Sequence, residues 1–143
     1  MTESEWWPAS DEAPETERLT RLGWDSDRDT EFAALELAGT VPGRVARVDR
    51  GICTVFAAAG AHRAAVPPRF EQPVVGDWAA IRPAVSGGDD AAVRALMERR
   101  TSFTRQAAGE ETLEQVVAAN VDVVFLVNAL DQRFSLRRLE RYL

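Results

Sequence analysis

The sequence predicts an all-β, OB-like barrel of five strands, followed by the first strand–helix unit of an α/β domain that this chain leaves incomplete. Short segments of alternating apolar and polar residues, separated by glycine turns, fill residues 41–98. The run 121–127 is almost continuously apolar and β-branched, which is typical of a strand buried on both faces. After Ser135, apolar residues recur at helical spacing up to the last residue.

The acidic stretch 1–40 comes first, and we expect it to be a largely disordered N-terminal extension. It carries eleven Asp and Glu residues against three Arg, whereas residues 41–143 carry twelve against fourteen. Such a composition disfavours a folded core. A short helix is expected within 22–39, lying against the next domain. Trp6 and Trp7 are unusual in this stretch. We interpret them as incidental aromatics of a tail, with a weak docking contact as the alternative.

The barrel is expected to occupy residues 41–98, with strands at 44–49, 52–57, 62–66, 78–82 and 92–97. In this region β-branched and apolar residues alternate with polar ones, and glycines mark the turns. Five strands in so short a stretch suit a closed barrel better than a sandwich, which needs about seven. One closed core is predicted to contain the side chains of Val45, Val48, Val55, Trp78, Ile81 and Leu96.

A polar linker is predicted at 99–112, and the α/β domain is predicted to begin at residue 113 and to continue to 143. Thr112 and Gln115 have the spacing of a capping box, which predicts a short helix through Ala119. One strand and one helix cannot bury their own apolar faces. The chain is therefore interpreted as the front part of a larger protein.

Arginines of the barrel are the candidate binding residues. They lie on and beside the first expected strand and in later parts of the barrel: Arg44, Arg47, Arg50, Arg63 and Arg69. The planar guanidinium donates two parallel hydrogen bonds to phosphate, and OB barrels are a common scaffold for oligonucleotides. The barrel lacks aromatic platforms for base stacking, so we predict RNA binding led by phosphate and shape. The alternative is that these arginines are only solvated strand positions.

Residue counts exclude several chemistries. All 17 basic residues are arginine, so neither a P-loop nor a Schiff-base lysine can be present. A single cysteine, Cys53, leaves no disulfide within the chain and no thiolate metal site, and we expect it to pack in a buried strand. The lone His62 is expected on the surface or in a turn. Residues 128–131, Asn-Ala-Leu-Asp, lack the lysine of a guanine-reading element and are interpreted as a strand-end turn.

No catalytic, nucleotide-binding or metal-binding residue, and no cofactor, is therefore assigned to this chain. No run approaches the roughly 20 apolar residues that span a membrane. The acidic N-terminus is unlike a signal peptide. A cytoplasmic location without a membrane partner is the expectation.

Four segments are similar to the ribosome small-subunit-dependent GTPases, a family with circularly permuted GTPase domains. They are VPGRVARVDRG at 41–51, PVVGDW at 73–78, RRTSFTR at 99–105 and EQVVAANVDVVFLVNALDQRFSLRRLERYL at 114–143. Each segment is weak alone, but their order and spacing make the resemblance specific. It implies an N-terminal OB barrel, a central permuted GTPase domain and a C-terminal zinc-binding domain.

The resemblance further implies GTP hydrolysis stimulated by the small (30S) ribosomal subunit, contact with its rRNA, and a role in late subunit maturation. In the permuted order, the guanine-reading element, the P-loop and the switches follow the helix that begins at Ser135. GTP, magnesium and zinc are thus implied for the full-length protein, expected to be a monomer, and this chain is predicted to be inactive alone. The alternative is a stand-alone RNA-binding or protein-docking OB-like module with no catalytic role.

Overall fold

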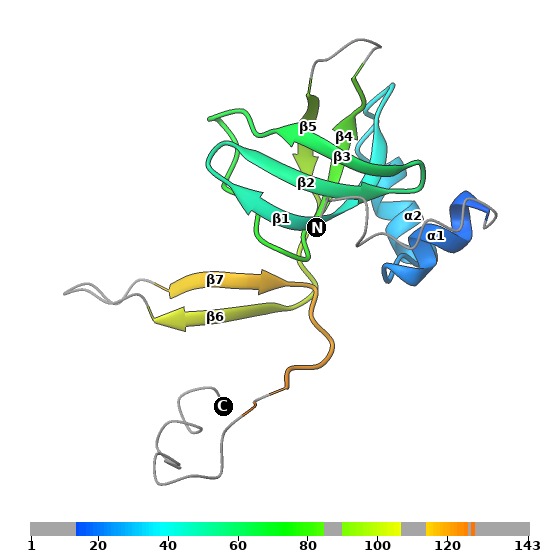
Figure 1. Ribbon diagram of the computed structural model, residues 1–143. Coiled ribbons are helices and arrows are strands. Elements are labelled where there is room, and N and C mark those ends of the chain that lie inside the picture. The colour runs from blue at the N-terminus through cyan, green and yellow to red at the C-terminus, as the bar shows by residue number, and fades with distance from the viewer. Residues whose placement is uncertain (1–13, 85–89, 107–113, 126, 128–143) are drawn as a thin grey trace, which may run out of the picture.

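The computed structural model describes residues 14–84, 90–106, 114–125 and 127. Five strands close into a barrel in the order β1-β2-β3-β5-β4, which confirms the predicted OB-like architecture (Figure 1). Their bounds are β1 Val41–Asp49, β2 Ile52–Ala57, β3 Gly60–Ala65, β4 Trp78–Arg82 and β5 Ala91–Leu96. The β3–β5 pair is parallel, and the other four pairs are antiparallel.

The barrel interior is filled by inward-facing residues from all five strands. On β2 the burial alternates residue by residue, and Cys53, Val55 and Ala57 face inward. Cys53 is fully buried, as expected, and its burial raises the pKa of the thiol to about 11. Val45 and Ile81 complete the centre of this cluster. Alternation with period two places every second side chain of such a strand inside the closed sheet.

The predicted single core is wrong for one residue, because Trp78 belongs to a second cluster. This cluster lies between the barrel and two helices, and it contains Leu19, Trp24, Trp78 and Met97. The rings of Trp24 and Trp78 meet edge to face with centroids 4.7 Å apart. Trp78 is the first residue of β4, and its indole packs against the helices instead of entering the barrel interior.

Helices α1 (Glu15–Arg21) and α2 (Ser26–Ala33) form part of the stretch that was expected to be mostly disordered. The expectation of disorder is wrong for α1, whose Leu19 is buried in the second cluster. Helix α2 lies within 22–39, where a helix was expected, and Asp25 caps it by accepting a hydrogen bond from the Arg28 amide. The acidic composition gave no indication of α1. Its one buried leucine and the neighbouring Trp24 are enough to anchor the helix.

The predicted linker and helix are replaced by a hairpin. Strands β6 (Ser102–Gln106) and β7 (Glu114–Ala119) pair antiparallel and form a separate two-stranded sheet (Figure 1). A parallel bridge between Val75 and Ala118 joins β7 to the barrel. The capping-box spacing therefore predicted the wrong element. The β-branched residues Val116 and Val117 favour a strand where a partner strand is available.

The apolar run near the end does not form the predicted buried strand in its described part, 121–125 and 127. Val123 is 66% exposed, Phe125 84% and Val127 91%. A strand buried on both faces needs neighbouring strands, and the described residues supply none beside it. The helix expected after Ser135 and the turn at 128–131 lie outside the described residues.

Candidate nucleic-acid interface and the adjoining polar junction

Two of the five candidate arginines project from strands of the barrel and pair with nearby acids. The Arg47 side chain is 63% exposed, and its Nε lies 3.1 Å from Asp49 Oδ2. The Arg63 side chain is 66% exposed, and its Nε lies 3.3 Å from Asp90 Oδ1. Ion pairs this exposed are weak and exchange readily for other partners, so both guanidinium groups can reach an external phosphate.

Two further arginines lie in neighbouring turns at one end of the barrel. Arg50 is exposed in the β1–β2 turn and makes no ion pair or hydrogen bond with the described residues. Arg69 lies in the β3–β4 connection with its guanidinium carbon 5.0 Å from the Phe70 ring centroid. The Val66 amide donates to the Gly51 carbonyl at 2.9 Å, which holds the two turns side by side.

Arg44 is placed differently from the other four. Its Nη1 donates to the Leu22 carbonyl, its Nη2 donates to the Asn120 carbonyl at 2.6 Å, and its guanidinium lies 5.7 Å from the Trp78 ring centroid. Burial lowers the pKa of this arginine. The side chain therefore ties the N-terminal helices and the end of β7 to the barrel.

A buried ion pair lies next to this contact, just before β4. Arg99 Nε donates to Asp77 Oδ1 at 2.7 Å and Arg99 Nη2 donates to Oδ2 at 2.9 Å. Asp77 is fully buried and also accepts from the Val74 amide at 2.8 Å. Hydrogen bonding to this carboxylate raises the pKa of Arg99. Such a paired and fully hydrogen-bonded carboxylate fixes the loop before β4.

Asn120 is the centre of a polar junction, which we define as Arg28, Arg44, Arg100 and Asn120. Asn120 Oδ1 accepts from Arg28 Nη2 at 2.8 Å and from the Arg100 amide at 3.0 Å. Its Nδ2 donates to the Gly76 carbonyl at 3.0 Å. A φ of +53° places this residue in the left-handed region, which asparagine tolerates better than most residues.

Ion pairs extend the polar junction to the start of α2. Arg100 donates to both carboxylate oxygens of Asp25 and to Glu31 Oε1 at 3.3 Å. The hydrogen bonds from Arg100 hold the pKa of Asp25 well below its usual range, and those bonds raise the pKa of Arg100. Residues of the junction help to line an open cavity of about 120 Å³. Because the three guanidinium groups of the junction already donate to protein oxygens, we interpret the junction as a structural cross-link.

The chain aligns over most of its length with proteins of one family. It is 39% identical over 140 residues to "Small ribosomal subunit biogenesis GTPase RsgA" of Opitutus terrae, covering 87% of this chain and 38% of that protein. The protein of the same name from Streptomyces avermitilis is 40% identical over 130 residues, covering 87% of this chain and 34% of the relative. That from Xanthomonas euvesicatoria is 36% identical over 151 residues, covering 94% and 39%. No protein-family model matches the chain.

The chain belongs to the small ribosomal subunit biogenesis GTPase family. It spans less than two fifths of the length of these relatives, which is consistent with the N-terminal portion that the sequence predicts. The resemblance noted from the sequence alone is confirmed.

The structure explains why the segments that carry the family resemblance occur together. In PVVGDW, an added Cβ on Gly76 would lie 2.0 Å from the Ala119 carbonyl oxygen, and φ at Gly76 is +91°. Only glycine lets the loop before β4 pass this close to the end of β7. Asp77 of the same segment pairs with Arg99 of RRTSFTR. Asn120 of the last segment bonds to Gly76. The family segments thus meet at the polar junction.

Sequence reasoning missed Arg28, Arg99, Arg100 and Asn120. The two arginines at 99–100 were assigned to a linker, and Arg28 was counted only as a charge in an acidic stretch. Arg28 is 1% exposed and also donates to the Glu98 carbonyl at 2.8 Å. The four family segments are the signal that could have pointed to most of these residues. A polar residue in each of the four segments bonds to a residue in another of them.

No group of three or more His, Cys, Asp and Glu side chains that could hold a metal ion occurs among the described residues. No lysine occurs anywhere in the sequence. No helix of the described part is both long enough and apolar enough to cross a membrane.

Proposed function

We propose that the chain is the N-terminal portion of a GTPase that acts in late maturation of the small (30S) ribosomal subunit. In this proposal the barrel contacts rRNA, and GTP binding and hydrolysis belong to the rest of the protein. The observation that carries the proposal is the match to relatives named as small ribosomal subunit biogenesis GTPases over nearly the whole of this chain. Subunit assembly would place the protein in the cytoplasm, and we expect a monomer.

Four arginines are proposed as the phosphate contacts: Arg47, Arg50, Arg63 and Arg69. They are the candidate arginines whose guanidinium groups are exposed or held only by weak surface pairs. The stacked Arg69 and Phe70 also offer a small platform against which a base or ribose can pack. Arg44 is proposed to position the barrel against its neighbours, because it is partly buried and both of its terminal nitrogens donate to backbone carbonyls.

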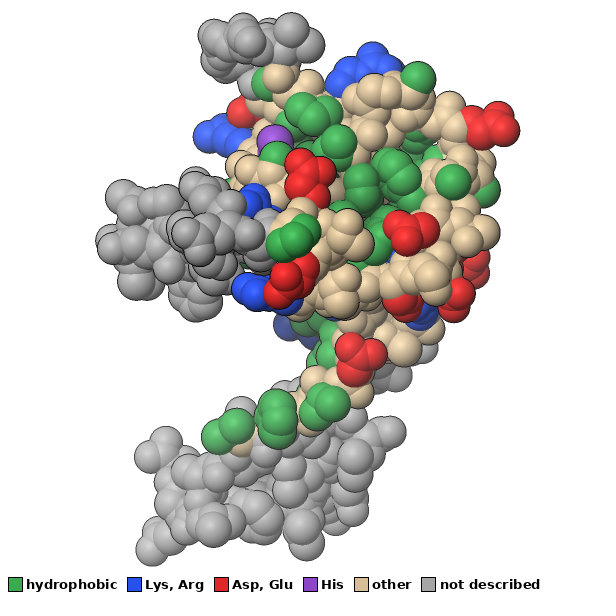
Figure 2. All heavy atoms as spheres, turned by 90° about the vertical axis from the view of Figure 1, so that its right-hand side faces the viewer, with side chains coloured by type: hydrophobic (Ala, Val, Ile, Leu, Met, Phe, Trp, Pro, Cys, Tyr) green, Lys and Arg blue, Asp and Glu red, His purple; other side chains and the backbone are tan. Residues whose placement is uncertain are grey.

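The distribution of charge on the molecule indicates which side of the barrel faces the RNA. The side of the molecule that carries α1 and α2 shows many acidic side chains, with basic ones mainly towards its margins (Figure 2). Acidic residues in the first turns of these helices include Glu15, Glu17, Asp27 and Asp29. A polyanion is repelled by this side, so we propose that the turn end of the barrel with Arg50 and Arg69 approaches the rRNA.

The test is salt-dependent binding of the chain to purified small subunits. Replacing Arg50 and Arg69 by Ala should lower the slope of log affinity against log salt by about 0.7 to 0.9 for each phosphate that is no longer neutralised. The matched control is the double substitution Arg21→Ala and Arg82→Ala. It removes the same charge from α1 and from the end of β4, at the other end of β1 from Arg50.

The control should leave the slope nearly unchanged. An equal effect of both double variants would mean that only net charge matters, and the proposed interface would be wrong. If the unsubstituted chain did not bind small subunits at all, the proposal that the barrel contacts rRNA would be wrong.

A further inference from the structure

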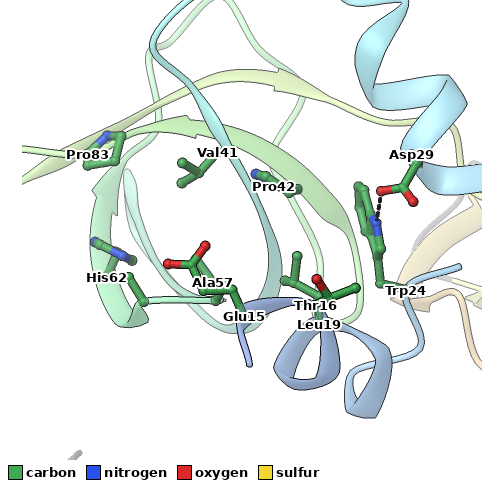
Figure 3. A pocket seen from close by; sticks show the side chains of 12 residues that line it. Glu15, Thr16, Leu19, Trp24, Asp29, Val41, Pro42, Ala57, His62 and Pro83 are labelled. Carbon is green, nitrogen blue, oxygen red and sulfur yellow. Dashed lines mark hydrogen bonds between the residues drawn. The ribbon is translucent and has the colours of Figure 1, made fainter. Parts of the chain in front are cut away.

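A cavity lies between α1, the start of β1 and the β2–β3 turn (Figure 3). Its volume is about 310 Å³, and most of its wall is apolar, with Leu19, Val41, Pro42 and Pro83 among the lining residues. Pockets for small ligands begin at about 300 Å³. This cavity therefore suits one aromatic side chain better than a larger molecule.

One polar atom in the wall has no partner. His62 lines the cavity, and its Nε2 is shielded from solvent without a hydrogen bond to any described residue. With the proton on Nδ1, this nitrogen is an acceptor that needs an N–H or O–H donor. The other aromatic group in the wall cannot serve, because Trp24 Nε1 already donates to Asp29 Oδ1 at 2.6 Å (Figure 3). A shielded acceptor of this kind calls for a donor from the occupant.

We propose that the occupant is an indole ring of the Trp6–Trp7 pair of this same chain. Indole combines a large apolar surface with a single N–H donor and no acceptor, which matches apolar walls and one unpaired acceptor. The pair lies in the stretch 1–13, outside the described residues. Seven residues, from Pro8 to Pro14, separate Trp7 from Glu15, and Glu15 and Thr16 are themselves lining residues. An extended heptapeptide spans up to about 25 Å, so the indole can reach the cavity.

Charge does not drive this contact. Glu15 and Asp29 line the cavity, and the segment around the tryptophans carries Glu3 and Glu5. Like charges oppose the approach, and added salt screens them. Docking through the indole ring should therefore become stronger as ionic strength rises.

The test is acrylamide quenching of tryptophan fluorescence in the full chain. Trp24 and Trp78 are 5% and 2% exposed, so the quenchable emission reports Trp6 and Trp7. In the unsubstituted chain one of these two indoles should be protected, and Trp6→Phe and Trp7→Phe show which. Ala59→Phe, at an exposed lining residue, should fill the cavity and raise the quenchable emission about twofold, because the displaced indole joins the exposed one.

Two further variants separate the site from general effects. His62→Phe keeps a ring but removes the acceptor, so protection should fall without being abolished. Ala61→Phe is the matched control, since Ala61 is also exposed but does not line the cavity, and it should leave quenching unchanged. Unchanged emission from Trp24 and Trp78 verifies folding in each case.

Several outcomes would overturn the proposal. One is that both tail indoles of the unsubstituted chain quench like those of a free peptide, and another is that protection survives Ala59→Phe. Protection that grows with protein concentration would mean that a second copy supplies the indole. Protection that weakens with added salt would mean that charge, and not the cavity, holds the tail.

Discussion

Asn120 and Gly76 join parts of the molecule that are far apart in the sequence. The Asn120 amide bonds to the Gly76 carbonyl 44 positions away, and its side-chain oxygen accepts from Arg28, 92 positions away. Both residues have positive φ values. Their importance follows from where β7 ends against the loop before β4, and this is a property of the tertiary structure.

Gly76→Ala should destabilise the chain more than Gly39→Ala. Both positions have positive φ, +91° and +70°, but an added Cβ meets the Ala119 carbonyl at Gly76 and nothing within 4 Å at Gly39. Backbone strain alone costs about 1 kcal/mol at Gly39, whereas the clash should bring the loss at Gly76 to about 3 kcal/mol. Urea unfolding measures both, and equal losses would show that the contact with Ala119 relaxes freely.

Asn120→Ala should lower the free energy of unfolding by about 2 to 3 kcal/mol, because buried partners on Arg28 and Gly76 lose their hydrogen bonds. Asn120→Gly loses the same bonds but accepts the positive φ, so it should be about 1 kcal/mol more stable than the alanine variant. Chemical denaturation of both variants provides the comparison. A stability equal to that of the unsubstituted chain would contradict the role assigned to the junction.

At the scale of elements, helix α2 and the β6–β7 hairpin are both held in place by partners that are distant in the sequence. Helix α2 is held by Asp25, which caps it and pairs with Arg100, just before β6. The hairpin arose where a linker and a helix were predicted. In both cases a partner distant in the sequence decides whether a short segment is ordered, because an isolated short helix or two-stranded hairpin is marginal in water.

Attachment of α2 should weaken in acid through Asp25. The pKa of Asp25 is lowered in the folded chain, chiefly by Arg100, so its contribution is present above the unfolded pKa, about 3.8, and is lost as pH falls towards the folded value. Asp25→Asn keeps a cap but not the ion pair. Relative to the unsubstituted chain, the loss of stability in this variant should be constant near neutral pH and should shrink below about pH 4. Thermal unfolding against pH measures this.

Asp27→Asn is the matched control for this experiment. Asp27 also lies in the first turn of α2, and it makes no ion pair with the described residues. A pH-dependent deficit of the same shape in this variant would show that the helix as a whole, rather than the Asp25–Arg100 pair, responds to acid.

At the scale of the whole molecule, a closed barrel contrasts with an exposed apolar segment. The barrel has no free strand edge, whereas Val123, Val124, Phe125 and Val127 project into solvent. Figure 2 shows hydrophobic side chains along a segment that leads away from the barrel. An exposed run of this kind needs a partner surface to cover it.

Hydrogen exchange should divide the molecule accordingly. Amides of β1 to β5 should be strongly protected, because they are bonded within a closed sheet around a buried core. Amides of residues 121–125 should exchange rapidly, since no strand pairs with them in the described part of the chain. Equal protection of both regions in a monomer would contradict this.

The 143-residue chain should neither hydrolyse GTP nor bind it tightly. The sequence has no lysine to contact the β- and γ-phosphates as a P-loop lysine does. Equilibrium binding of a labelled guanine nucleotide is the measurement. Micromolar or tighter binding would instead implicate Asn128 and Asp131 as base-reading residues.

Much of the fold could be predicted from the sequence because its signals are local. Alternation in β2 and the turn residues between strands specify short strands, and the volume of Val45, Val55 and Ile81 suits one small interior. The absence of lysine by itself excludes a P-loop here. Family membership also followed from the order of segments, although no single segment was decisive.

Only the tertiary structure decided how those segments are used. Arg44 was grouped with the RNA-facing arginines, and the structure shows its two terminal nitrogens donating to the Leu22 and Asn120 carbonyls. Trp78 was assigned to the barrel interior, yet it anchors the helices from outside. Residues 102–106, expected in a linker, became a strand only through pairing with β7. The physical reason is common to all three: a side chain's role depends on which distant group lies within bonding or packing distance, and periodicity along the chain does not encode that distance.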